Sequence, residues 1–289
     1  MRSSGIPRPC FTRIPGLFNG DVSLAPLVLL LGFGISLSFF LFGIQRDNAD
    51  AQLQFRLQAR DYVSSIANRV TENNTTVEAV AALVNASDHV DRDEFRIFTQ
   101  PFLDQNPSIQ ALQWIQYSKD SEREKFEALA QADGLTDFHF KDLDSIETSD
   151  PSPQRDDYYV IYYNEPAEPN HLVTGLDNGS DTGRKEALLG AVKRGCATSS
   201  SPITVPQENE GSRAYLVYVP VYTTPTIKEG VTPVRSDLAG FAAGVFRVDS
   251  LLSSVLGEKQ REMVHLSITD ITNTAEPLPV GTTKICHCW

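Results

Sequence analysis

The sequence predicts an α+β protein in which a long N-terminal helix is followed by antiparallel β-sheet. Two observations support this prediction. An apolar segment near the N-terminus passes directly into a polar segment that keeps a helical period. After it, short runs rich in β-branched and aromatic residues are interleaved with short amphipathic helices. This mixture favours antiparallel sheet over a parallel, doubly wound fold.

The composition indicates a folded protein whose main part is acidic. The 289 residues suffice for two modest domains, and 41% hydrophobic with 21% charged residues is typical of globular chains. The net charge is −12; residues 1–23 carry +2, from three arginines against Asp21, so the remainder carries −14. A part this acidic argues against nucleic acid or anionic lipid as its main partner.

The apolar segment, Leu24 to Ile44, contains no charged residue. As a helix it spans about 30 Å, the thickness of the hydrocarbon core of a bilayer, so 24–44 is the predicted transmembrane helix. A cleaved signal peptide is the main alternative, because Ala49-Asp50-Ala51 offers small residues at a cleavage site, but signal segments are usually shorter. The arginines of residues 1–23 place the N-terminus in the cytoplasm and the rest outside a single-pass plasma membrane anchor.

Residues 45–90 are predicted to form stalk helices. Apolar residues recur at helical spacing through Gln45–Thr71, namely Leu53, Leu57, Val63, Ile66 and Val70. This stripe packs either on its own domain or on a second stalk in a homodimer. Glu72-Asn73-Asn74 is expected to interrupt the helix, and Thr75 with Glu78 to cap a second helix through about Val84.

The remaining chain is predicted to alternate between strands and helices. The strands are Ile109–Tyr117, Tyr158–Tyr163, Ala214–Tyr222, Ala239–Val248 and Met263–Asp270. The helices begin near Asp91 (with Glu94 as a capping box), Asp120, Arg184 and Asp249. Gly195 is placed where a left-handed helix C-cap belongs. Loop, helix and strand follow each other closely between Asn164 and Tyr222, so a small pocket is expected there.

The sequence predicts neither catalysis nor a cofactor. Ser199–Ser201 lack a nucleophile elbow, and the histidines are scattered. Cys286-His287-Cys288 is too compact to enclose a metal without a second cluster, so no metal site is predicted. Four Asn-x-Ser/Thr patterns are glycan acceptors if the chain is eukaryotic and lies outside the cell: Asn73, Asn74, Asn85 and Asn178.

Three features in this order and spacing resemble the CHASE domain, the extracytoplasmic sensor of receptor histidine kinases and nucleotide cyclases, including plant cytokinin receptors. They are Glu165-Pro166 before Gly175-Leu176-Asp177, the Arg184 helix, and Tyr218-Val219-Pro220-Val221-Tyr222. The similarity extends from about Asp47 to Val280.

The resemblance implies two PAS-like domains after the stalk and dimerisation through the stalk helix. The membrane-distal domain, 91–225, would bind the ligand, and 226–280 would form the membrane-proximal domain. Residues 281–289 would be a tail; because relatives continue through a second membrane helix into a cytoplasmic output domain, the resemblance implies either that the sequence is cut short here or that it works through a partner. The sequence shows no kinase, cyclase or receiver signature.

The resemblance also implies which residues line the pocket: Leu172, Arg184, Ser200, Pro206 and Tyr218. Cytokinin receptors carry an acidic residue at the position that matches Arg184. The reversed charge disfavours adenine-type cytokinin and suits a carboxylate or another anion. A solvated Arg184, paired with Asp181 or Glu186 on the surface, is the alternative from the residues themselves.

The sequence therefore predicts the extracytoplasmic small-molecule sensor of a membrane receptor, which is not itself an enzyme. An anchored or secreted hydrolase is the first alternative, and it requires a nucleophile and base that converge in a cleft. A structural anchor protein without a ligand is the second, and it requires a filled core behind Arg184 and Tyr218.

Overall fold

A computed structural model describes residues 24–204, 213–223, 237–256, 266–270 and 278–282. The chain divides into two compact units, residues 1–60 and 61–289. The described part of the first unit belongs to helix α1, Leu24–Ala86. Its apolar side chains are exposed from Leu24 through Ile44. This is the one helix in the described residues that is long and apolar enough to cross a membrane.

The predicted interruption of the stalk at Glu72-Asn73-Asn74 is wrong, because α1 continues to Ala86. The side chain of Asn73 is fully buried and donates to the Tyr215 hydroxyl over 2.8 Å. Its Oδ1 accepts from Nδ2 of Asn106 over 2.9 Å. These tertiary hydrogen bonds offset the weak helix propensity of asparagine, which the local sequence alone could not indicate.

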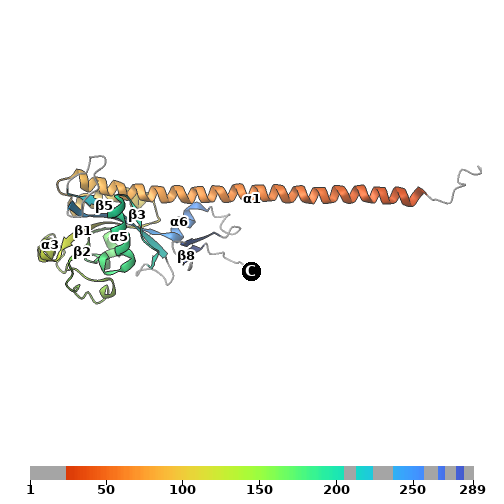
Figure 1. Ribbon diagram of the computed structural model, residues 1–289. Coiled ribbons are helices and arrows are strands. Elements are labelled where there is room, and N and C mark those ends of the chain that lie inside the picture. The colour runs from red at the N-terminus through yellow and green to blue at the C-terminus, as the bar shows by residue number, and fades with distance from the viewer. Residues whose placement is uncertain (1–23, 205–212, 224–236, 257–265, 271–277, 283–289) are drawn as a thin grey trace, which may run out of the picture. The chain divides into compact units, whose positions relative to one another are not determined.

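The second unit is built on a six-stranded antiparallel sheet (Figure 1). The strand order is β2-β1-β6-β5-β3, with β4 paired to β5. The bounds are β1 Ile109–Lys119, β2 Asp157–Glu165, β3 Thr198–Ser199, β4 Ile203–Thr204, β5 Arg213–Tyr222 and β6 Leu238–Arg247. A two-stranded ribbon, β7 (Ser267–Asp270) with β8 (Leu278–Thr282), forms a separate sheet. The predicted α+β class with antiparallel sheet is confirmed.

The domain boundary that the resemblance implies, between residues 225 and 226, would separate β5 from β6, although these strands pair in the same sheet. The strand predicted at 239–248 is β6, and it lies between β1 and β5 as a central strand of the first sheet. Pairing of β1 with β6 joins residues more than a hundred positions apart, and no local pattern specifies it. The described part of the proposed membrane-proximal domain that lies outside this sheet consists of α6, β7 and β8.

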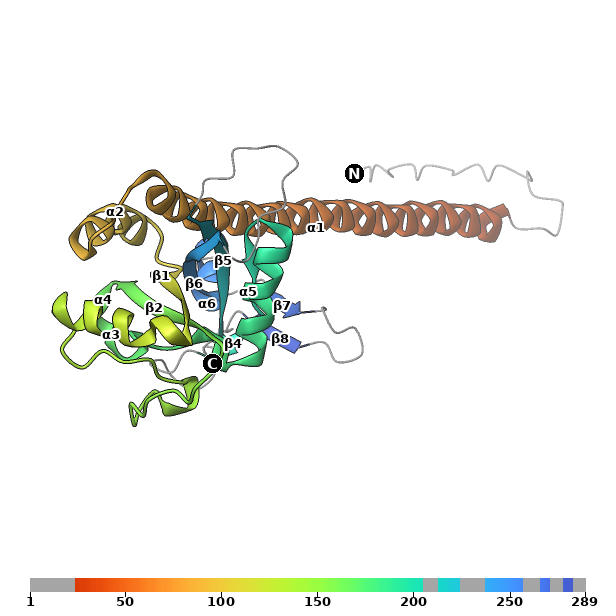
Figure 2. The same ribbon diagram turned by 60° about the vertical axis from the view of Figure 1, so that its left-hand side comes forward.

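The helices surround the sheet (Figure 2). Their bounds are α2 Arg92–Gln105, α3 Arg123–Ala132, α4 Ala167–Asn170, α5 Thr182–Arg194 and α6 Val248–Val255. Short 3-10 turns lie at 120–122, 143–145, 171–173 and 178–180. The predicted capping box of Asp91 and Glu94 is confirmed at α2. Gly195 has φ 66° and ends α5 in the left-handed conformation, as predicted.

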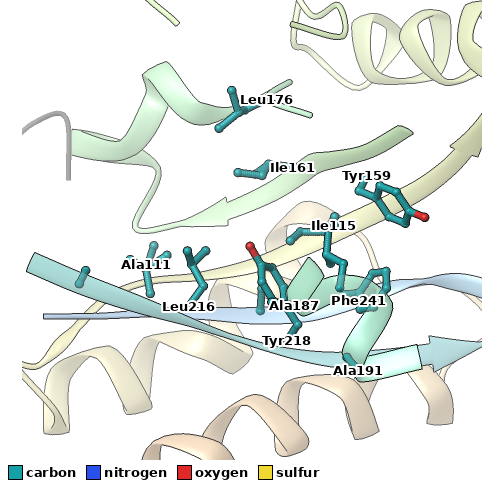
Figure 3. Close-up of a cluster of buried hydrophobic side chains, with 14 of the residues drawn as sticks. Ala111, Ile115, Tyr159, Ile161, Leu176, Ala187, Ala191, Leu216, Tyr218 and Phe241 are labelled. Atoms are coloured by element: carbon teal, nitrogen blue, oxygen red, sulfur yellow. The ribbon is translucent and has the colours of Figure 1, made fainter. Parts of the chain in front are cut away.

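The two faces of the sheet carry different hydrophobic layers, because neighbouring strand residues point to opposite sides. Val217 and Val221 of β5 pack with Val77 of α1 on one face. Leu216 and Tyr218 pack with α5 on the other (Figure 3). In Figure 3 these two side chains lie beside those of β1, β2, β6 and α5. Helix α5, from the segment in which a pocket is expected, therefore covers the face that carries Leu216 and Tyr218.

Candidate functional site

Helix α5 turns Arg184 towards the sheet. Asp181 caps the helix by accepting from the backbone N–H of Arg184 over 2.8 Å. The buried face of α5 consists of Arg184, Ala187, Leu188 and Ala191. This spacing puts the arginine on the same stripe as the three apolar residues. The guanidinium therefore enters the protein, and Arg184 is 6% exposed. A solvated surface arginine, the alternative from the sequence, is wrong.

Two hollows share Arg184 in their linings. The smaller one, which we call the inner cavity, has a volume of about 40 Å³. Its apolar lining comes from Ala111, Ile161, Val173, Ile203, Leu216 and Val245. The larger one, the outer groove, of about 370 Å³, is lined by Leu143, Asp181, Gly183 and residues 201–204. Arg184 thus belongs to both hollows.

The guanidinium of Arg184 makes few contacts for a buried charge. Its Nη1 donates to Oδ1 of Asn178 over 3.3 Å, which is long for a hydrogen bond of this kind. Its Nε is buried and has no partner among the described residues. Within the described part of the chain, no carboxylate lies at ion-pair distance from it. A buried arginine without a counter-charge suits an anionic ligand.

Asn178 supplies a second donor beside Arg184. Its Oδ1 accepts from Arg184 and, over 3.2 Å, from the hydroxyl of Tyr218. Because a guanidinium can only donate, this oxygen is fixed towards Arg184 and the amide nitrogen points the other way. That Nδ2 is buried and unpartnered among the described residues. Burial of Tyr218 raises the pKa of its phenol, so the hydroxyl stays protonated and keeps its hydrogen bond to Asn178.

Four amide side chains, which we call the amide wall, line the inner cavity or hydrogen-bond to residues that line it, and the sequence does not single them out. They are Gln110, Gln113, Asn164 and Asn170, each under 9% exposed. Gln110, Gln113 and Asn170 line the inner cavity together with Arg184. The pairing of β1 with β6 shifts register between Ile109 and Ala111, and this bulge places Gln110 on the cavity side. The available signal in the sequence was the presence of amide residues among the apolar residues of a predicted strand, Ile109–Tyr117.

The hydrogen bonds of this amide wall fix the orientation of Gln113. Nδ2 of Asn164 donates to the backbone carbonyl of Asn170 over 2.8 Å, and a carbonyl can only accept. Oδ1 of Asn164 is therefore free to accept from Nε2 of Gln113, over 2.9 Å. The other end of the Gln113 amide, Oε1, is then an unpartnered buried acceptor among the described residues.

The other predicted site residues have different positions. Tyr218 is fully buried beside Asn178 and touches the site through its hydroxyl. Ser200 exchanges hydrogen bonds with the backbone of Leu216 and so fixes the sheet edge next to the groove. Leu172 is 38% exposed and does not line either hollow; its neighbour Val173 lines the inner cavity. Pro206 lies outside the described residues.

An ion-pair cluster holds the loop in front of α5. Arg155 pairs with Asp142 and, over 3.2 Å, with the fully buried Asp177. Asp177 also accepts from the backbone N–H groups of Tyr159 and Gly179, each over 2.8 Å. The hydrogen bond from Arg155 lowers the pKa of Asp142, whereas burial raises the pKa of Asp177. Asp177 therefore has a structural role in this loop.

Two further expectations concern metals and glycans. The described residues contain no group of three His, Cys, Asp or Glu side chains arranged to hold a metal. Cys286-His287-Cys288 lies outside them. Among the Asn-x-Ser/Thr patterns, the side chains of Asn73 and Asn178 are fully buried, so neither can carry a glycan in the folded protein. Asn85 is exposed at the end of α1.

Comparison with known proteins identifies the family. The sequence profile of the CHASE domain matches residues 88–280, about two thirds of the chain. The hybrid signal transduction histidine kinase A of Dictyostelium discoideum is 22% identical over 285 residues. The match covers 96% of this chain but 12% of that protein. The ligand-binding domain of the Pseudomonas aeruginosa PAO1 amino acid chemoreceptor PctC, in complex with GABA, superposes with a TM-score of 0.37. It is 13% identical, over 74% of this chain and 70% of that one.

Proposed function

This chain belongs to the CHASE domain family of extracytoplasmic sensors, and we propose that its ligand is a small carboxylate held by Arg184. The carboxylate would accept from Nε of Arg184, which is buried and unpartnered among the described residues. This unused donor on a buried guanidinium without a counter-charge is the observation that carries the proposal.

The energetics support an anion at this position. A buried guanidinium without a counter-charge is unfavourable, because burial removes its hydration and one long hydrogen bond replaces little of it. A carboxylate restores the missing charge and can form two hydrogen bonds to the planar guanidinium. Adenine-type cytokinins carry no such charge, and they remain excluded from the proposal for that reason.

The ligand would enter through the outer groove and pass Arg184 to reach the inner cavity. The inner cavity holds a group of only a few atoms, while the groove of about 370 Å³ leaves room for the remainder of the ligand. Movement of Arg184 would open the passage between them. Binding can shift a receptor only if the ligand has different affinities for the two states, and a mobile Arg184 supplies such a difference.

Helix α1 would carry the signal. Leu216 of β5 lines the inner cavity, and the next residue, Val217, packs on the opposite face in the layer that contains Val77 of α1. A Cβ at Gly244 of β6 would lie 2.8 Å from Cγ2 of Val77, so sheet and helix are in close contact here. A change of sheet curvature at the cavity would therefore displace α1.

The remaining features of the receptor are proposed as the sequence predicts them. The segment 24–44 would anchor the chain in the plasma membrane with its N-terminus in the cytoplasm. Two copies would associate as a homodimer through their stalk helices, and the domain itself would bind without catalysis. The kinase activity of the Dictyostelium relative belongs to that protein. A cytoplasmic output domain would be needed to convert the movement of α1 into a signal.

The test measures thermal unfolding of the full chain in lipid nanodiscs with acetate, glycolate, propionate, lactate or adenine. A carboxylate at a hundred times its Kd should stabilise the domain by about 2.7 kcal/mol, which raises Tm by about 5–10 °C. Arg184→Met should abolish the shift. Lys193→Met, which removes an exposed charge from the same helix, should leave it intact. Stabilisation by adenine that survives Arg184→Met would contradict the proposal.

A further inference from the structure

The lining of the inner cavity includes a residue with an unused acceptor as well as Arg184 with its unused donor. Oε1 of Gln113 is buried and without a partner among the described residues, and Gln113 and Arg184 line the same cavity. An unsatisfied buried acceptor is costly, and native proteins rarely keep one without a purpose. The cavity is therefore lined by two chemically different groups, a cationic donor and a neutral acceptor.

Hydrogen bonds fix the orientation of the Gln113 amide, so its oxygen and not its nitrogen is the atom without a partner. Turning the Gln113 amide over would place its oxygen against Oδ1 of Asn164, two acceptors at hydrogen-bond distance. Turning the Asn164 amide as well would place its oxygen against the carbonyl of Asn170. The backbone carbonyl therefore fixes both amides in one orientation, and Oε1 of Gln113 must accept from something in the cavity.

We infer that the ligand of this receptor is a small carboxylate that also carries a neutral hydrogen-bond donor, a hydroxyl or an uncharged N–H, directed at Gln113. The inference rests on the proposed function and adds a second recognition element to it. Arg184 would bind the carboxylate, and Gln113 would select among carboxylates by the donor that they carry.

The electrostatics of the amide wall favour a neutral donor over an ammonium group. Among the described residues, the lining of the inner cavity contains no Asp or Glu, and its three polar residues besides Arg184 are amides. An ammonium group buried here would lack a counter-charge and would lie close to a guanidinium of the same sign. A hydroxyl or amide N–H satisfies Gln113 without that cost. Hydroxy acids and acylamino acids belong to the class, whereas unmodified amino acids do not.

Bound water is the competing explanation for the unpartnered acceptor. A cavity of about 40 Å³ is large enough for a few water molecules, and water donates hydrogen bonds as a hydroxyl does. Water would satisfy Gln113 whichever carboxylate binds, so it predicts no preference between a carboxylate with a hydroxyl and one without. The two explanations therefore differ in a measurable quantity.

The experiment measures Kd by isothermal titration calorimetry on the full chain in lipid nanodiscs, with matched pairs of probes. The pairs are acetate with glycolate, propionate with lactate, and propionate with 3-hydroxypropionate, so that the position of the hydroxyl varies. At one position the hydroxylated probe should bind about five- to tenfold more tightly than its plain partner. Glycine and β-alanine, with ammonium in place of the hydroxyl, should bind more weakly than glycolate and 3-hydroxypropionate.

The variant Gln113→Leu removes the acceptor at similar volume. It should equalise the affinities within the preferred pair without abolishing carboxylate binding, whereas Arg184→Met should abolish binding of both probes. The comparison within the wild-type protein needs no variant, so the test survives if Gln113→Leu fails to fold. Equal affinities in every pair, or a preference that persists in Gln113→Leu, would overturn the inference and leave the proposed function standing. If no carboxylate binds at all, the proposed function fails first.

Discussion

Replacement of Arg184 by methionine should stabilise the ligand-free protein, although it removes a charged residue from the folded core. The lost contact is one hydrogen bond of 3.3 Å to Asn178, worth about 0.5–1 kcal/mol. The Asn178 oxygen keeps its bond to Tyr218, so no new acceptor is left unpaired. Against this, methionine relieves the burial of an unpaired guanidinium and packs on Ile203 and Leu216, a gain of about 2–3 kcal/mol.

The net stabilisation is about 1–2 kcal/mol, which raises Tm by about 3–6 °C for a unit of this size. Differential scanning calorimetry of the ligand-free full chain in detergent measures it. Arg155→Met is the matched control, because it makes the same substitution at an arginine that pairs with Asp142 and Asp177. That variant leaves a buried carboxylate without its cation and should cost about 3 kcal/mol.

The opposite signs of the two shifts make the test specific. If Arg184→Met lowers Tm as Arg155→Met does, Arg184 has a carboxylate partner within its own chain and holds the fold together. The argument for an anionic ligand would then lose its basis. A rise in Tm with loss of carboxylate binding would instead show a residue kept for binding at the expense of stability.

Three further predictions test the fold around the site. Asn73→Ala should destabilise the domain by about 2 kcal/mol in chemical denaturation, because Tyr215 and Asn106 lose their hydrogen-bond partner. The control Asn85→Ala, at an exposed position of the same helix, should change the stability by less than about 0.5 kcal/mol. Gly240→Ala should cost about 3 kcal/mol, since its Cβ would lie 2.2 Å from the carbonyl oxygen of Ile115 and push β6 from β1, and an unchanged denaturation midpoint would refute that close approach. The pKa of Asp142 is lowered in the folded state by Arg155, so the stability it contributes is present above its unfolded pKa of about 3.9 and is lost as the pH falls through the lower folded value. Asp142→Asn should therefore flatten the acid side of the stability curve, and an identical pH dependence in both proteins would contradict the assignment.

Local patterns in the sequence predicted much of the secondary structure. The capping box at Asp91, the C-cap at Gly195 and the aromatic strand at Tyr158–Tyr163 all form where predicted. Each depends on interactions within a few residues, which is why sequence suffices for them. The α+β class and the family resemblance followed from the same local features and their order.

The errors arose where distant residues meet. Asn73 continues α1 because it bonds to Tyr215 and Asn106, and β6 completes the first sheet because it pairs with β1 and β5. The sequence next to these residues does not indicate either contact, since the partners are far apart along the chain. Helix propensity therefore gave the wrong expectation at Asn73, and no local pattern specified the pairing of β6 with β1 and β5.

The candidate site also combines features that the local sequence indicates with features that only the fold determines. The sequence by itself indicated that Arg184 lies near the start of a helix in a segment expected to form a pocket, and the resemblance indicated that its charge differs from the cytokinin pattern. The sequence left open whether Arg184 is solvated, and the structure shows that Arg184 shares the buried face of α5 with Ala187, Leu188 and Ala191. Tertiary structure alone decided that this arginine lacks a carboxylate among the described residues and lines the same cavity as Gln113. The reason is physical: hydrogen-bond satisfaction depends on which atoms the fold brings within 3 Å or so, and those atoms come from β1, β2 and α5, which only the folded chain places together.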